Sequence, residues 1–407
     1  MKNNYTAFTI CNIAYLHKAL SLAQSYKNIS NLKINIFLCD GKRLIPDYSD
    51  IAEIHWIEDL NIADFHSLSF KYDVTELTTS IKPYLAMSLL ENNKKVIFFD
   101  PDTYILNSID CIIEMLDVSP IVLTPHYVTP QDRGTALSQS DIGMMRFGSF
   151  NLGFFAISDD EEGFQFLEWW DKRCRDLCFF ETQFGLSTDQ KWISIAPCFF
   201  PNLHISFNLG LNVSFWNLHE REVSLCPKTN NFSINNKFDL TFFHFSSFDH
   251  EEPCKLSTRP FEIDISLKKP LLSIINDYAK THHDYKKTLS EVNTDYKYEY
   301  MSDGKLITPV LRLAYASKLE SFREVNLFDS NGLMGSFAKK NNLLPRKNKK
   351  YSPAGFNELE KNKHTYNLII FTMRMLLKVF GPVRFANLSR LFVYLSSFRQ
   401  NSSLWKL

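Results

Sequence analysis

The 407-residue chain lacks several features that decide where a protein resides. No stretch of about 18 apolar residues is free of charged ones, so no helix is expected to span a bilayer. The region Met1–Tyr15 lacks a cationic segment followed by a continuous apolar one, so no secretory signal is expected. The eight cysteines lack the spacing of a disulfide framework, which is typical of reduced thiols in a cytoplasmic protein.

Two further absences narrow the classes of function. Lys plus Arg and Asp plus Glu number 45 each, so no excess of positive charge points to a nucleic acid partner. The segment Thr9–Leu20 contains no glycine, whereas a nucleotidyltransferase needs a glycine-rich phosphate loop after its first strand. Nucleic acid binding and nucleotidyl transfer are therefore not expected.

What the sequence does contain is an alternation of strand and helix patterns from Tyr5 to Leu123. This alternation is typical of an α/β domain with a largely parallel sheet. In such sheets ligands bind at the carboxyl ends of the strands. The expected strands are Ala7–Cys11, Ile34–Asp40, Ile54–Ile57 and Ile121–Leu123, and the expected helices are Tyr15–Tyr26 and Thr79–Glu91.

Two carboxylates follow one apolar strand directly. The run Val96–Asp102 ends in Asp100 and Asp102, and alternate side chains of an extended chain share a face. Two neighbouring anions need a divalent cation or a shared proton between them, and we favour the cation. An isolated Asp-x-Asp more often caps a turn or a helix, so the pair needs support from the rest of the chain.

The later elements set the predicted domain division. Strands are expected at Phe150–Phe155 and Leu240–Phe245, a helix at Glu161–Asp176, and a boundary at Pro253–Pro260. The predicted regions are a catalytic domain over 1–255, a mostly helical accessory region over 256–350, and a basic helical tail over 351–407.

The tail has an unusual charge pattern. Thr365–Leu407 contains no Asp or Glu, and Gly381-Pro382 is expected to split it into two helices. Two interpretations stay open: a basic amphipathic pair on an anionic membrane surface, or a helical hairpin packed on the core with solvated cations. The cations are Arg374, Lys378, Arg384, Arg390, Arg399 and Lys406.

Several ordered signals between Tyr5 and Phe248 resemble one known family. They are the strand and helix of Phe8–Tyr26, Ile81-Lys82-Pro83 before the acidic strand, Phe150–Gly153, Asp189-Gln190 and Phe243–Ser246. The chain resembles glycosyltransferases of the GT-A fold, most closely the retaining, family-8-like branch and related bacterial polysaccharide and O-antigen transferases. The resemblance implies an α/β, Rossmann-like mixed sheet with a C-terminal helical extension. It also implies a nucleotide-diphosphate sugar as donor and a glycan or lipid-linked molecule as acceptor.

The resemblance further implies a metal centre. Asp100, Asp102 and His244 correspond to the residues that hold Mn²⁺ or Mg²⁺, which grips the diphosphate of the donor. Carboxylates with one imidazole suit Mn²⁺ somewhat better than Mg²⁺. For His244 the alternative is an ordinary hydrogen-bonded histidine at a strand end.

Further roles follow from the same resemblance. Asn151 corresponds to a residue facing the donor sugar, and Asp189 and Gln190 to a pair beside the reacting carbon, where an amide or carboxylate stabilises an oxocarbenium-like centre. Lys82 is expected against the donor together with Asp100. The alternatives are a solvated lysine at a helix start for Lys82 and a helix cap for Asp189.

The chain departs from the family pattern at two places. Thr9 and Cys11 end the first strand, beside the expected nucleotide, where family members commonly have an acid, so the base stays open. Ser246-Ser247-Phe248 replaces a later glycine and Lys-Pro-Trp. His126 and an exposed Trp216 are candidates for acceptor contacts, with core packing as the alternative for Trp216.

Two other functions compete with sugar transfer. Aspartate-nucleophile phosphatases also carry Asp-x-Asp after a strand, but they place Thr or Val where this chain has Tyr104. A non-catalytic sugar-binding module or membrane scaffold is the other alternative. The sequence therefore predicts a metal-dependent, retaining glycosyltransferase in the cytoplasm, peripheral on the cytoplasmic face of the inner membrane, that acts on a surface glycan.

Overall fold

The computed structural model describes residues 4–131, 141–226, 231–252, 255–259, 265, 268–323, 325–347 and 363–407. The chain divides into two compact units. The first comprises 1–63 and 74–297, and the second comprises 64–73 and 298–407. The predicted boundary at 255 falls within the first unit, since α9 (Lys269–Thr288) packs on α1 (Leu16–Ser30). The functional division into catalytic, accessory and tail regions stays a prediction.

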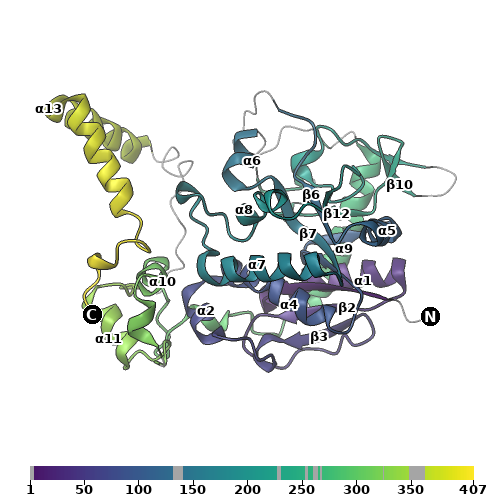
Figure 1. The fold of residues 1–407 in the computed structure, drawn as a ribbon, viewed down its shortest axis with the longest axis horizontal. Coiled ribbons are helices and arrows are strands. Elements are labelled where there is room, and N and C mark those ends of the chain that lie inside the picture. Colours follow the sequence, from purple (N-terminus) through teal and green to yellow (C-terminus); the bar gives the residue numbers. More distant parts are fainter. Residues whose placement is uncertain are drawn as a thin grey trace. The chain divides into compact units, whose positions relative to one another are not determined.

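A seven-stranded mixed sheet organises the first unit, with the strand order β3-β2-β1-β4-β7-β6-β8 (Figure 1). Strand β7 runs antiparallel to both neighbours, and the other adjacent pairs are parallel. The predicted α/β class with a largely parallel mixed sheet is confirmed. The strands are β1 (Tyr5–Cys11), β2 (Ile34–Leu38), β3 (Ala52–Trp56), β4 (Lys95–Phe99), β6 (Ile121–Pro125), β7 (Phe150–Ser158) and β8 (Leu203–Ile205).

Helices cover both faces of this sheet because its strands are apolar on both sides. On one face, Ala7, Ile97 and Phe154 join the core formed with α1 and α5 (Asp110–Val118). On the other face, Phe155 meets Trp170 of α7 at a ring-centroid distance of 5.0 Å. The helices of this unit besides α1, α5 and α9 are α3 (Val74–Ser80), α4 (Lys82–Leu90), α6 (Asp141–Phe147), α7 (Glu161–Leu177) and α8 (Gln190–Ile193).

Smaller sheets complete the first unit. β5 (Thr103–Ile105) pairs antiparallel with β12 (Phe242–His244). β9 (Val223–Leu225), β10 (Phe232–Ile234) and β11 (Phe238–Asp239) form a three-stranded sheet. The prediction of a single helix over Thr79–Glu91 is wrong at its N-terminal end. Helix α3 ends at Ser80, and α4 begins at Lys82 with Pro83 in its first turn.

The second unit is helical, as the expected C-terminal extension requires. It consists of α2 (Phe65–Lys71), α10 (Pro309–Ala316), α11 (Leu333–Lys340) and α13 (Lys363–Leu395). Its core includes Phe70, Leu311 and Met334. The expected break in the tail is confirmed, because Gly381 interrupts α13 with φ 73° and ψ 165°. Among the described helices, none is long and apolar enough to cross a membrane.

Candidate metal centre

Both acids leave the sheet at the carboxyl end of β4. The last residues of β4 are buried, and the amide of Asp100 donates to the carbonyl of Gly153 in β7 at 2.8 Å. The amide of Thr103 then donates to the carbonyl of Asp100 at 3.0 Å, which closes a turn. The two carboxylates therefore sit on a hydrogen-bonded turn at the carboxyl edge of the sheet.

The pairing of β5 with β12 brings a histidine to this turn. Thr103 lies opposite His244 in the register, and the amide of Phe245 donates to the carbonyl of Asp102 at 2.7 Å. His244 Nε2 lies 3.1 Å from Asp102 Oδ1 and 3.7 Å from Asp100 Oδ2. One ligand atom from each of the three residues lies within 4.8 Å of the others. The predicted set of Asp100, Asp102 and His244 is thus brought together.

An asparagine orients the imidazole. His244 Nδ1 lies 3.2 Å from Asn212 Oδ1. The other end of this buried amide, Nδ2, donates to Thr124 Oγ1 at 3.0 Å and Asn151 Oδ1 at 3.1 Å. Oδ1 must therefore accept, so His244 donates from Nδ1 and turns Nε2 toward the acids. Histidine ligands of metals are commonly held in this way.

A glycine makes room for the ring. A Cβ atom on Gly153 would lie 2.6 Å from His244 Nδ1 and 2.8 Å from Asn151 Oδ1, and still closer to His244 Cε1. Such distances are far inside van der Waals contact, so only glycine allows the histidine to stand here. Two carboxylates and one imidazole in a preformed cradle fit a hard divalent cation.

The electrostatics of Asp102 agree with this arrangement. Burial raises the pKa of this carboxyl, but His244 and Lys18 more than compensate, so the pKa lies well below its usual range. Lys18 Nζ lies 3.9 Å from Asp102 Oδ2. The carboxylate is therefore charged at neutral pH, as metal binding requires.

Lys82 is buried and lies between two acids. Its Nζ is 3.2 Å from Asp189 Oδ2, 3.6 Å from Asp100 Oδ1 and 2.9 Å from the carbonyl of Leu152, to which it donates. Burial lowers the pKa of Lys82, but Asp100 and Asp189 outweigh it and raise the pKa. Lys82 is thus a fixed cation, and the alternative of a solvated lysine is wrong.

Asp189 pairs with that cation. It precedes α8, but its side chain makes no capping hydrogen bond, so the helix-cap alternative is wrong. Burial raises the pKa of Asp189 and the nearby charge of Asp100 adds to this, although Lys82 acts in the opposite direction. Asp100 therefore belongs both to the candidate metal ligands and to the charged group around Lys82.

The other two predicted catalytic residues are engaged in hydrogen bonds. Asn151 Oδ1 accepts from the amide of Gly153 at 3.0 Å, and its Nδ2 lies 3.4 Å from His126 Nε2. Gln190 Nε2 donates to the carbonyl of Phe147 at 3.0 Å. Burial lowers the pKa of His126 to about 4, so it is neutral and can accept from Asn151.

Three predicted contact residues are less accessible than expected. Thr9 and Cys11 are buried on β1, and burial raises the pKa of the Cys11 thiol. The prediction that Trp216 is exposed is wrong, because its ring is buried and packs edge-on against His244 with ring centroids 5.2 Å apart. Trp216 therefore packs in the core, which was the alternative for this residue.

Sequence reasoning missed Lys18 and Asn212. Lys18 stands in the first turn of the helix that follows β1, and helix starts there face the carboxyl edge of the sheet, so its position was a usable signal. Asn212 has φ 55° in an irregular segment, and no sequence pattern marked it.

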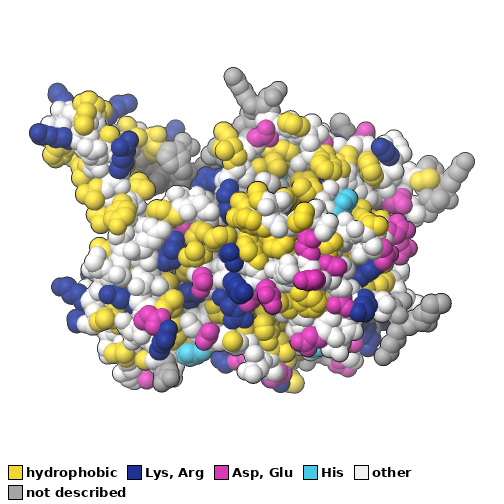
Figure 2. All heavy atoms as spheres, in the orientation of Figure 1, with side chains coloured by type: hydrophobic (Ala, Val, Ile, Leu, Met, Phe, Trp, Pro, Cys, Tyr) yellow, Lys and Arg dark blue, Asp and Glu magenta, His cyan; other side chains and the backbone are white. Residues whose placement is uncertain are grey.

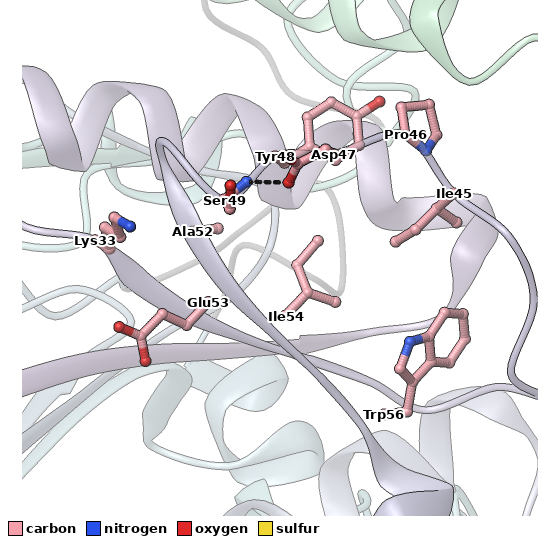
Figure 3. Close-up of a pocket in the computed structure, with 10 residues that line it drawn as sticks. All are labelled: Lys33, Ile45, Pro46, Asp47, Tyr48, Ser49, Ala52, Glu53, Ile54 and Trp56. Carbon is pink, nitrogen blue, oxygen red and sulfur yellow. Dashed lines mark hydrogen bonds between the residues drawn. The ribbon is translucent and has the colours of Figure 1, made fainter.

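A separate pocket lies at the edge strand β3 (Figure 3). Ile54 and Trp56 of β3 face Tyr48 and the turn in which the amide of Ser49 donates to Asp47 Oδ1 at 2.9 Å. This pocket is lined by Lys33 and residues between Ile45 and Trp56, so it is distinct from the metal set.

Comparisons with known proteins complete the description. No model of a known protein family matches the chain. The uncharacterized protein YfnF of Bacillus subtilis (strain 168) is 23% identical over 254 residues, which are 59% of this chain and 80% of that protein.

Similar solved structures are glycosyltransferases. GlyE of Streptococcus pneumoniae TIGR4 matches at a TM-score of 0.40 and 12% identity, over 78% of this chain and 72% of that one. The galactosyltransferase LgtC in complex with donor and acceptor sugar analogs matches at 0.38 and 10%, over 68% and 95%. Mouse xyloside xylosyltransferase 1 matches at 0.34 and 11%, over 60% and 97%. Because these TM-scores are low, no residue role is transferred from these proteins.

Proposed function

We propose that this chain is a metal-dependent glycosyltransferase that moves a sugar from a nucleotide-diphosphate sugar to a cell-surface glycan or lipid-linked acceptor. The observation that carries the proposal is the meeting of Asp100, Asp102 and His244 at the carboxyl end of β4, within 4.8 Å. These residues would hold Mn²⁺ or Mg²⁺. When bound, the cation stabilises the negative charge that a nucleoside diphosphate gains as it leaves.

The residues around Asp100, Asp102 and His244 have further roles in the proposed reaction. Lys82 keeps a positive charge beside Asp100 and holds the Asp189 carboxylate in place, which fixes the anionic side of the site. Asp189 is the predicted stabiliser of the positively charged sugar carbon, with Asn151 and Gln190 as neighbours. Thr9 and Cys11 remain proposed for the nucleotide side. Retention of the anomeric configuration is proposed from the family resemblance.

The paired acids favour this function over its alternatives. A phosphatase needs one aspartate as an unhindered nucleophile, whereas Asp102 lies 3.1 Å from His244 and Asp100 lies 3.6 Å from Lys82. A scaffold has no need for a buried Lys–Asp pair, which costs desolvation energy to maintain. A cytoplasmic location beside the inner membrane fits the proposed donor.

The test is turnover with a panel of nucleotide sugars in Mn²⁺, in Mg²⁺ and in EDTA, with released nucleotide and glycosylated product measured. We expect metal-dependent release from one donor and a loss of 100-fold or more in Asp102→Asn, since removal of a single charge-stabilising group costs about 10²–10³ in kcat. The matched control is Asp159→Asn, whose carboxylate pairs with the exposed Lys94.

Two outcomes would contradict the proposal. Full turnover in Asp102→Asn would rule out the metal mechanism. Absence of metal-dependent binding of nucleoside diphosphates would favour the scaffold instead.

A further inference from the structure

Helix α13 carries an exposed apolar surface. None of its side chains is buried, and several are more than half exposed, including Leu368 at 66% and Val379 at 70%. Soluble surfaces rarely expose contiguous apolar patches of this kind without a binding partner. The large exposed apolar residues of α13 are Leu368, Ile369, Phe371, Met373, Met375, Leu377, Val379, Phe380, Val383, Leu391, Phe392, Val393, Tyr394 and Leu395.

The cations of the first arm lie along one narrow stripe. Lys363, Asn367, Arg374 and Lys378 are spaced by four, seven and four positions, so they share one side of a 3.6-residue helix. Ile369, Met373, Leu376 and Phe380 follow the same periodicity on a different side. The arm before the break at Gly381 therefore has one cationic edge and a broad apolar face.

The second arm also has an apolar side. Phe385, Leu388, Phe392 and Leu395 lie on one side at spacings of three, four and three. Arg390 lies on another side, whereas Arg384, four positions before Leu388, stands at the edge of the apolar side. Because Gly381 interrupts the helix with a positive φ, the two arms can each turn an apolar face toward one surface.

The charge of this region has a single sign. No Asp or Glu occurs in Thr365–Leu407, which carries six Lys and Arg residues. Figure 2 shows yellow and dark blue side chains over α13. A second copy of α13 would bring cations against cations, which is unfavourable, whereas an anionic lipid surface satisfies both the charge and the apolar face.

The end of α13 is tied to the second unit. Beyond the helix, Asn341 Nδ2 donates to the carbonyl of Lys406 at 2.8 Å, and the amide of Lys406 donates to Asn341 Oδ1 at 2.9 Å. Trp405 packs against the core of the second unit. An attachment made by α13 would thus be transmitted to the folded part of this unit.

We propose that α13 is an interfacial membrane anchor, whose two arms lie in the surface of an anionic bilayer with their apolar faces inserted and their cations on the headgroups. The lipid surface is the committed partner, rather than a second copy or another protein. This inference goes beyond the catalytic proposal and does not depend on it, because it concerns vesicle binding and not turnover.

The experiment is sedimentation of the full chain with vesicles of phosphatidylcholine, alone or mixed with phosphatidylglycerol. We expect binding to the anionic vesicles, weakened by high salt because surface charges are screened. The double variant Arg374→Gln with Lys378→Gln should bind about 30-fold more weakly, from about a fivefold loss per cation at a charged surface. Ile369→Gln with Phe380→Gln should abolish binding.

The matched control is Arg323→Gln with Lys305→Gln, which removes the same charge from exposed positions elsewhere in the second unit. It should bind like the unchanged protein. Three outcomes would overturn the proposal: no binding to anionic vesicles, equal binding to neutral ones, or concentration-dependent dimerisation that the α13 variants abolish. Circular dichroism of each variant shows whether it is folded.

Discussion

At the scale of single residues, the buried ion pair of Lys82 and Asp189 is costly in desolvation energy. Both side chains are almost fully buried, and Lys82 Nζ also faces Asp100. Breaking a buried pair leaves an uncompensated charge, and this costs more than the pair contributes. Lys82 therefore stabilises the local fold beside the candidate metal ligands.

We predict that Lys82→Met destabilises the first unit by about 3–5 kcal/mol, because Asp189 is left buried without its cation. Urea unfolding followed by tryptophan fluorescence measures the loss. The control is Lys94→Met, which removes an exposed partner of Asp159 and should cost about 0–1 kcal/mol. Adding Asp189→Asn to Lys82→Met should restore part of the stability. Equal losses in Lys82→Met and Lys94→Met would contradict the prediction.

For the site, the types of residue could be predicted from the sequence better than their burial and their contacts. Asp100 and Asp102 could be identified because two neighbouring acids at a strand end need a cation between them, whereas His244 followed only from the resemblance to a known family. The burial of Trp216 and Lys82 could not be read from the sequence, because it depends on which distant segments cover them. Asn212 was missed for the same reason: its role arises only from its position between Thr124, Asn151 and His244.

At the scale of elements, the parallel strands were predictable and the small pairings were not. β1, β2 and β4 are apolar runs separated by helices, which is a local pattern. The β5–β12 pair joins three-residue strands that are far apart in sequence, and such short strands carry little periodicity. This pair is nevertheless the one that places His244 opposite Thr103.

The packing of α1 on α9 brings three histidines together. The rings of His17 and His282 have centroids 4.4 Å apart, and those of His250 and His282 are 4.9 Å apart. Lys18 of α1 and Lys286 of α9 add positive charge. Burial and then these neighbours lower the pKa of His17 to about 4 and of His282 to about 2, from 6.5.

We predict that acid weakens the α1–α9 packing. Below pH 6.5, His17 and His282 bind protons more readily in the unfolded chain than in the folded protein. The free energy of unfolding therefore has its full value above about pH 6.5 and falls as the pH decreases toward 4. Unfolding at pH 7 and pH 5 measures the difference, which should shrink in His282→Gln. The control is His283→Gln, an exposed neighbour on the same helix. An unchanged pH dependence in His282→Gln would contradict the prediction.

At the scale of the whole molecule, the two units are interleaved in sequence. Residues 64–73 lie within the first unit's sequence but belong to the second. The buried Arg312 holds them: its Nη1 donates to the carbonyls of Ser69, Phe70 and Tyr72 at 3.1, 2.8 and 2.6 Å, and its Nη2 donates to the carbonyl of Tyr298 at 2.7 Å. No sequence boundary signal revealed this arrangement.

We predict that Arg312→Met unfolds the second unit selectively, since four buried carbonyls lose their donor and each loss costs about 1–3 kcal/mol. Limited proteolysis should cleave within 64–73 and in the part of the second unit that follows residue 298, while the first unit resists. The control is Arg323→Met, an exposed arginine paired with Glu320. Proteolysis of both units at the same rate would show that they do not unfold separately.

The interleaving also sets an order of events during synthesis. Arg312, which donates to carbonyls of residues 69–72, lies about 240 positions later in the chain. Helix α2 therefore leaves the ribosome long before the core that receives Phe70 exists. Domains generally fold as they emerge, and exposed apolar segments invite aggregation meanwhile. The second unit can therefore mature only after translation has passed Arg312 and Met334, and until then α2 is a natural target for chaperones.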